Sequence, residues 1–181
     1  MNKLLFLLMM VGSSVFAQQK TKNLVVVTLD GYRWKELFTG ADEELINTKT
    51  FITQKNVKQK YWRATAEERR AVLMPFVWGT IAKKGQIYGN RNLGNLMNVK
   101  NRYWFSYPGY NEMFTGYPDT LVNSNAFPPN HNINVLEFIN QQPVYKGKVA
   151  VFAGWNAYYR ILNQERSQLP INAGWAEFKG P

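Results

Sequence analysis

Ser106 stands in a sequence context that could give its hydroxyl a chemical role. It lies two residues before Pro108, and proline favours the first turn of a helix. Residues 110–115 can form that helix, and Gly116 can end it. A hydroxyl at a helix N-terminus lies beside unpaired backbone N–H groups and the positive end of the helix dipole, which favours anion binding and helps to ionise a nucleophile. Ser106 is therefore a candidate nucleophile; the alternative is that it only caps the helix.

Asp30 is the second candidate, because it ends an apolar stretch. Residues 24–29 (Leu-Val-Val-Val-Thr-Leu) are too few for a helix and too apolar for a half-exposed strand, which predicts a strand buried on both faces of a parallel sheet. Open α/β sheets bind ligands at the carboxyl ends of such strands. Gly31 allows a sharp turn there. The alternative is that Asp30 merely begins a loop, since Asp-Gly is a common turn pair.

Further elements would position these two residues. A capping box at Thr65 and Glu68 predicts the start of a helix over 69–84, with a kink or a new start at Pro75. Segment 43–64 is expected to be irregular. Strands and helices in alternation predict a three-layer α/β/α sandwich with a mostly parallel central sheet. The other expected elements are a helical turn at 32–38, strands at 86–88, near 96–99 and at 148–153, and helices from about 132–134 to before Pro143 and over 155–163.

Composition narrows the class of protein. The chain has 181 residues, which suffices for one domain with a real core. It has no cysteine, so disulfides and thiolate chemistry are excluded. The formal net charge is +10, but the lysines and arginines are scattered and form no stripe with stacking aromatics, so no nucleic-acid partner is expected. The other interpretations are attraction of a small anionic substrate and, for most of these lysines, solvated surface charge with no specific partner.

The first 17 residues have the pattern of a secretory signal peptide. A basic start at Lys3 precedes an apolar middle, and small residues precede Ala17, so cleavage is expected between Ala17 and Gln18. The apolar run is too short to span a bilayer, and no later segment is long and apolar enough to do so. We therefore expect a periplasmic or secreted protein, with residues 18–181 forming the folded part.

Two motifs in order resemble those of a known group of enzymes. A strand ending in Asp30-Gly31, followed by Ser106-x-Pro108 and then Thr115-Gly116-x-Pro118, resembles the alkaline phosphatase superfamily. The similarity is greatest to its type I phosphodiesterase/nucleotide pyrophosphatase-like and phosphoglycerate-mutase-like branch. It covers residues 23–153, most of the chain after the leader. The resemblance implies an alkaline-phosphatase-like catalytic domain, of which residues 18–181 would be the N-terminal part.

The resemblance also implies roles for individual residues. Asp30 matches the first metal-ligand aspartate, and Ser106 matches the nucleophile, which also bridges toward a metal ion. Asn125 matches a donor to the phosphoryl oxygen, with Asn123 as the alternative. Such enzymes use two divalent ions, usually zinc, and form a covalent phosphoryl-enzyme that water hydrolyses. The implied function is an exported, metal-dependent phosphoric ester hydrolase acting on a small-molecule phosphate ester.

Several alternatives stay open at this stage. Sulfatases of the same superfamily have Ser/Cys-x-Pro-x-Arg, but Tyr110 stands in place of that arginine, which favours an unmodified serine and a phosphate ester. Monoester, diester and phosphomutase chemistry are not separated by the sequence, nor is the oligomeric state. A non-catalytic exported anion-binding protein, with its site at Ser106, is the competitor from another class.

The expected metal site is incomplete in this chain. A two-zinc site of this type resembles one built from about six His and Asp ligands, yet the chain has one histidine, His131, and three aspartates. Asp42 and Asp119 are interpreted as turn residues, and His131 as an exposed loop histidine. We therefore expect the chain to be the N-terminal portion of a longer enzyme and to be inactive alone.

Overall fold

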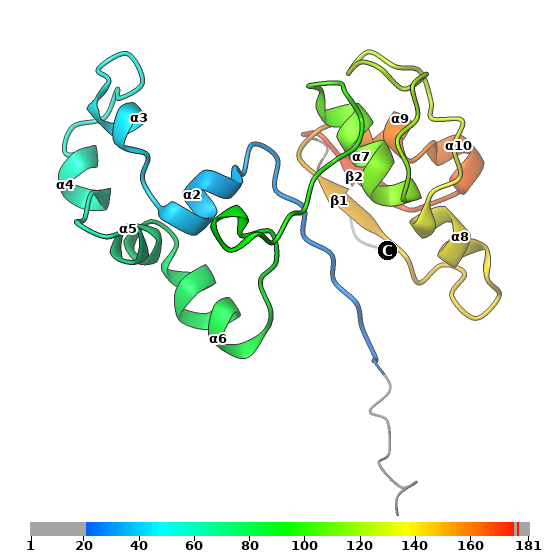
Figure 1. Ribbon diagram of the computed structural model, residues 1–181. Coiled ribbons are helices and arrows are strands. Elements are labelled where there is room, and N and C mark those ends of the chain that lie inside the picture. The colour runs from blue at the N-terminus through cyan, green and yellow to red at the C-terminus, as the bar shows by residue number, and fades with distance from the viewer. Residues whose placement is uncertain (1–20, 176, 178–181) are drawn as a thin grey trace, which may run out of the picture. The chain divides into compact units, whose positions relative to one another are not determined.

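The computed structural model describes residues 21–175 and residue 177 (Figure 1). The chain divides into two compact units, residues 1–31 and 32–181, and each is described by itself. The predicted signal peptide lies outside the described residues. None of the helices among the described residues has the length and apolar character needed to cross a membrane.

The described part of the first unit, residues 21–31, is neither helix nor strand. The apolar side chains from Leu24 to Leu29 are between 61% and 80% exposed. The prediction of a strand buried on both faces at 24–29 is therefore wrong for this structure. A stable strand needs neighbouring strands and covering layers, and among the described residues only β1 and β2 are paired as a sheet. Asp30 and Gly31 form an exposed turn, and the positive φ of Gly31, 70°, confirms the expected turn there.

The second unit contains the regular elements. In chain order they are α2 (Trp34–Thr39), α3 (Glu43–Asn47), α4 (Val57–Tyr61), α5 (Ala66–Leu73), the π-helix η2 (Val77–Ile81), α6 (Ala82–Lys84), the 3-10 helix η3 (Arg91–Leu93), α7 (Ser106–Thr115), α8 (Val135–Gln141), β1 (Val151–Ala153), α9 (Tyr158–Ile161), α10 (Gln164–Ser167) and β2 (Ile171–Ala173).

The predicted capping box forms at the start of α5. The Thr65 hydroxyl accepts from the Glu68 N–H at 3.2 Å, and the Glu68 carboxylate accepts from the Thr65 N–H at 3.1 Å. The expected break also occurs, because α5 ends before Pro75, which cannot donate into the helical ladder. The chain then resumes as η2 and α6. Two short helices, α3 and α4, form in the segment that was expected to be irregular.

Helix α2 packs against α5, and the backbone at the end of α2 lies close to the backbone of α5. A Cβ added to Gly40 would lie 2.3 Å from backbone atoms of Arg69 and Arg70, so only glycine fits. These arginines donate to the last carbonyls of α2, Arg69 to Thr39 at 3.3 Å and Arg70 to Phe38 at 3.2 Å. Both arginines had been counted as scattered surface charge, but here they satisfy a helix C-terminus.

The sheet within the described residues has two parallel strands, β1 and β2, with Val151 opposite Ile171. The prediction of a strand at 148–153 is confirmed at 151–153 only, and Phe152 is 64% exposed, so this strand is not buried on both faces. Residues 86–88 and 96–99, expected as strands, have no regular structure because no neighbouring segment pairs with them. Strand β2 was not predicted. The three-layer sandwich stays a prediction.

The hydrophobic core of the second unit gathers around α7. Tyr107, Val122, Ile161, Leu162 and Leu169 are at most 2% exposed and belong to one cluster. Helix α7 packs against α8 and α9, and α9 packs against β2. The predicted helix at 110–115 is confirmed and starts earlier, at Ser106, while Gly116 ends it with a φ of 82°. The start of α7 is thus anchored in the core.

Candidate functional site

Ser106 is the first residue of α7. Phe105 occupies the N-cap position with an extended backbone, and its own side chain makes no cap hydrogen bond. The alternative interpretation, in which Ser106 is the N-cap of the helix, is therefore wrong. The Ser106 side chain is half-buried, and its hydroxyl makes no hydrogen bond to the described residues. A polar atom at a helix N-terminus is thus left available to a ligand.

Asn125 lies at the same end of α7. Its side-chain oxygen accepts a hydrogen bond of 3.0 Å from the backbone N–H of Tyr107, the residue after Ser106. An N–H can donate only to an acceptor, so this contact fixes which end of the amide is the oxygen. The Asn125 NH2 group makes no hydrogen bond within residues 21–175. The structure therefore brings Asn125 and Ser106 to one helix end, whereas the alternative residue, Asn123, is exposed and makes no such contact.

Tyr107 holds this helix end in the core. Its side chain is fully buried, and its ring meets the ring of Phe127 edge-on at 5.6 Å between centroids. The Tyr107 hydroxyl lies 2.7 Å from the carbonyl oxygen of Pro128 and 2.9 Å from that of Arg160. Burial raises the pKa of Tyr107, so the phenol stays neutral and able to donate. A rigid anchor thus sits directly next to Ser106.

Three aspartates are the remaining candidates for metal binding among the residues named from the sequence. Asp30 belongs to the first unit, in its exposed turn. Asp42 is the N-cap of α3 and accepts from the N–H groups of Glu44 and Leu45, which confirms its interpretation as a turn residue. Asp119 accepts from the Leu121 N–H at 2.8 Å, as a turn aspartate does.

His131 lies in a loop and is paired with Asp119. The Nε2 atom of His131 is 2.7 Å from the Asp119 carboxylate, and the histidine side chain is 46% exposed. The expectation of an exposed loop histidine is confirmed. Hydrogen bonds from the Asn132 amide, the Leu121 N–H and His131 hold the pKa of Asp119 below its ordinary value, against the opposing effect of burial.

A metal centre cannot be completed from the residues that the structure describes. No group of three or more His, Asp or Glu side chains among them is arranged to hold an ion. Asp42 and Asp119 already accept hydrogen bonds from their own chain. Zinc sites use three or four protein ligands. The described residues alone do not fit the two-zinc centre that the resemblance implies.

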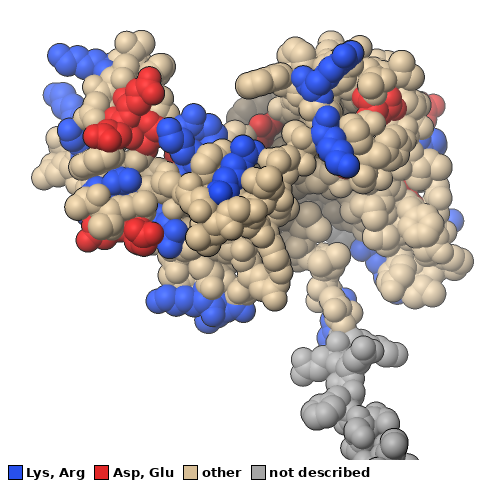
Figure 2. Space-filling view, in the orientation of Figure 1, with Lys and Arg blue, Asp and Glu red and all other residues tan. Residues whose placement is uncertain are grey.

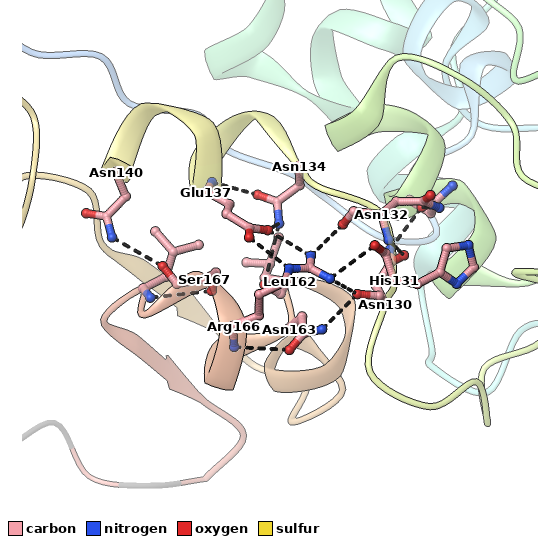
Figure 3. A network of polar contacts seen from close by, with 12 residues as sticks. Asn130, His131, Asn132, Asn134, Glu137, Asn140, Leu162, Asn163, Arg166 and Ser167 are labelled. Carbon is pink, nitrogen blue, oxygen red and sulfur yellow. Dashed lines mark hydrogen bonds and ion pairs between the residues drawn. The ribbon is translucent and has the colours of Figure 1, made fainter. Parts of the chain in front are cut away.

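An ion pair between buried Glu137 and the more exposed Arg166 supports the asparagine-rich loop between α7 and α8 (Figure 3). Glu137 is fully buried, and Arg166 binds both of its carboxylate oxygens at 2.8 Å. The same guanidinium donates to three successive backbone carbonyls, those of Asn130, His131 and Asn132. Glu137 raises the pKa of Arg166, mainly by this hydrogen bonding. Sequence reasoning missed this ion pair, because its two residues lie 29 positions apart and no local signal links them.

The positive charge is distributed over several places. On the face that Figure 2 draws, Lys and Arg side chains form several separate small groups, with carboxylates near some of them. Arg69, Arg70 and Arg166 are engaged with backbone carbonyls, as described above. The arrangement agrees with the scattered charge of the sequence.

Comparisons with known proteins give no match: no protein-family model, no curated protein and no solved structure matches this chain.

Proposed function

We propose that the N-terminus of α7 is the phosphoryl site of an exported phosphoric ester hydrolase, with Ser106 as nucleophile and Asn125 as a donor to the phosphoryl group. The observation that carries the proposal is the 3.0 Å hydrogen bond from the Tyr107 N–H to Asn125. This bond ties the Asn125 amide to the first turn of α7, the turn that begins at Ser106. Neither the Ser106 hydroxyl nor the Asn125 NH2 group is hydrogen-bonded to the described residues.

These groups suit the chemistry of phosphoryl transfer. The Ser106 oxygen would form a bond to phosphorus as the bond to the leaving oxygen breaks, and water would then cleave the phosphoserine. The Asn125 NH2 would donate to a non-bridging oxygen, where negative charge gathers in the transition state. The helix N-terminus favours the same charge. Asn125 needs no reorganisation to act, because the Tyr107 N–H already holds its oxygen.

The rest of the proposal depends on the family resemblance. The resemblance implies that Asp30 and Ser106 would be two ligands of a divalent-metal centre, zinc in the first instance, which would supply a Lewis acid. With one histidine and three aspartates in 181 residues, the other ligands would come from further chain. The alkaline-phosphatase-like sandwich and a periplasmic or secreted location belong to the same proposal.

The test is a pair of serine variants in the protein expressed from its complete reading frame. Ser106→Ala should abolish hydrolysis of nitrophenyl phosphate mono- or diesters, because it removes the proposed nucleophile. Ser124→Ala is the matched control, since Ser124 lies beside Asn125 but not at a helix N-terminus, and it should retain activity. Phosphate binding that depends on Ser106, without any turnover in the wild type, would favour the anion-binding alternative instead.

A further inference from the structure

The loop that carries Asn125 is held by Arg160, the third residue of α9. The Arg160 guanidinium donates to the backbone carbonyl of Asn125 at 3.2 Å and to that of Phe127 at 2.5 Å. A planar guanidinium can bridge two acceptors with separate N–H groups in one fixed geometry. One side chain from α9 thus fixes the loop backbone on both sides of Ala126.

The backbone of Arg160 joins the same place to α7. Its carbonyl oxygen lies 2.9 Å from the Tyr107 hydroxyl, and it also accepts from the Asn130 N–H at 2.9 Å. The guanidinium carbon lies 5.9 Å from the centre of the Tyr107 ring. Arg160 therefore contacts the residue after Ser106 and both ends of the loop at 125–130. Three segments distant in sequence meet at this one residue.

Arg160, Asn125 and Tyr107 are linked to one another by a cycle of hydrogen-bond contacts at the candidate site. Arg160 holds the backbone of Asn125, Asn125 accepts from the Tyr107 N–H, and Tyr107 reaches back to the carbonyl of Arg160. Loss of the guanidinium would leave two loop carbonyls without their donor. The loop would then be free to move, and the Asn125 side chain with it. The bond from Tyr107 to Asn125 alone is a single neutral hydrogen bond, with a net contribution of only about 1 kcal/mol.

We infer that Arg160 is a positioning residue that holds Asn125 at the first turn of α7, which begins at Ser106. It is not a catalytic residue, because its donors in the structure are directed to carbonyls of its own chain. The geometric part of the inference stands on the contacts above. Its consequence for catalysis rests on the proposed function, in which the Asn125 NH2 must meet the phosphoryl group at a fixed place.

Hydrogen exchange of single backbone amides tests the geometric part in the 181-residue chain. In Arg160→Met, the Tyr107 amide should exchange about tenfold faster, since a freed loop no longer holds its acceptor. The Met74 amide, which donates to Arg70 within the α5 region, should keep its rate and show that the chain is folded there. Arg102→Met is the matched control, because Arg102 lies over the ring of Tyr103 and makes no hydrogen bond or ion pair with the described residues. Unchanged exchange at Tyr107 in folded Arg160→Met would overturn the inference.

Arg160→Lys decides the question if Arg160→Met does not fold. Lysine keeps the charge and the long stem but cannot bridge two carbonyls with a rigid fork. We expect faster exchange at Tyr107 in this variant too, and wild-type exchange would overturn the inference. In the protein from the complete reading frame, Arg160→Lys should lower kcat more than it changes KM. If the wild type has no turnover, the proposed function is wrong. The hydrogen-exchange rate of the Tyr107 amide still tests whether Arg160 holds Asn125 in place.

Discussion

Asn125 accepts a hydrogen bond from the backbone N–H of Tyr107, 18 positions earlier in the chain, at 3.0 Å. The bond ties a loop to the first turn of α7, and it orients an amide whose NH2 has no partner among the described residues. Because Tyr107 is fully buried, the helix start itself is fixed. The candidate site therefore consists of a rigid helix end and one oriented side chain.

Asn125→Asp tests the acceptor and the donor of this amide separately, because it keeps an acceptor oxygen and removes the NH2 group. The carboxylate can still accept from the Tyr107 N–H, so the thermal unfolding midpoint should change little. The donor is lost and a negative charge replaces it, so hydrolysis should fall by about 100- to 1,000-fold if the amide stabilises the transition state. Asn123→Asp adds the same charge two residues away, at an exposed side chain. Equal activity of the two variants would contradict the role of Asn125.

Gly40→Ala tests the packing of α2 on α5. The new methyl would lie 2.3 Å from backbone atoms of Arg69 and Arg70, and the backbone of Gly40, with φ 73° and ψ −150°, suits only glycine. We expect a loss of about 3 kcal/mol or more in the free energy of unfolding. Gly94→Ala has open space and a left-handed backbone, so it should cost about 1–2 kcal/mol. Chemical denaturation measures both, and equal losses would refute the close approach.

Asp119→Asn tests the loop around His131 through its pH dependence. The pKa of Asp119 in the folded chain lies below its ordinary value of 3.8, mainly because Asn132 donates to it. This contribution to stability is therefore present above pH 3.8 and is lost as the pH falls through the folded-state pKa. The unfolding free energy of the variant should fall less steeply than that of the wild type between about pH 5 and pH 3. Parallel pH profiles would show that Asp119 is not held in this way.

The sequence predicted local features whose causes lie within a few residues. The capping box at Thr65, the break at Pro75 and the helix end at Gly116 each depend on the chemistry of one turn, and all three are confirmed. Ser106 was correctly expected near a helix start for the same reason.

Features that depend on distant partners were not predictable in this way. The stretch at 24–29 has the composition of a buried strand, but burial needs neighbours that composition does not supply. The contacts of Arg69 with α2, of Arg160 with the loop at 125–127, and of Arg166 with Glu137 join residues at least 29 positions apart. Nothing local marks these arginines as different from solvated ones. Asn125 was found only through the family resemblance.

The 181-residue chain alone should not hydrolyse phosphate esters, even with added zinc. It has one histidine, and no three ligating side chains among its described residues are grouped for an ion. The assay uses nitrophenyl phosphate mono- and diesters, with buffer and zinc alone as the control. Turnover at enzyme-like rates would show that this chain completes an active centre by itself, and it would overturn the expectation that further ligands are needed.

Trapping of the phosphoryl-enzyme tests the central claim most directly. The protein from the complete reading frame is mixed with nitrophenyl phosphate and zinc, quenched in acid, digested and analysed by mass spectrometry. We predict one phosphoryl group on the peptide that contains Ser106, present with substrate, and absent from Ser106→Ala but not from Ser124→Ala. Two results would contradict the assignment of Ser106 as the nucleophile. One is wild-type turnover in Ser106→Ala when the wild-type enzyme hydrolyses the ester, and the other is a phosphoryl group on a different residue.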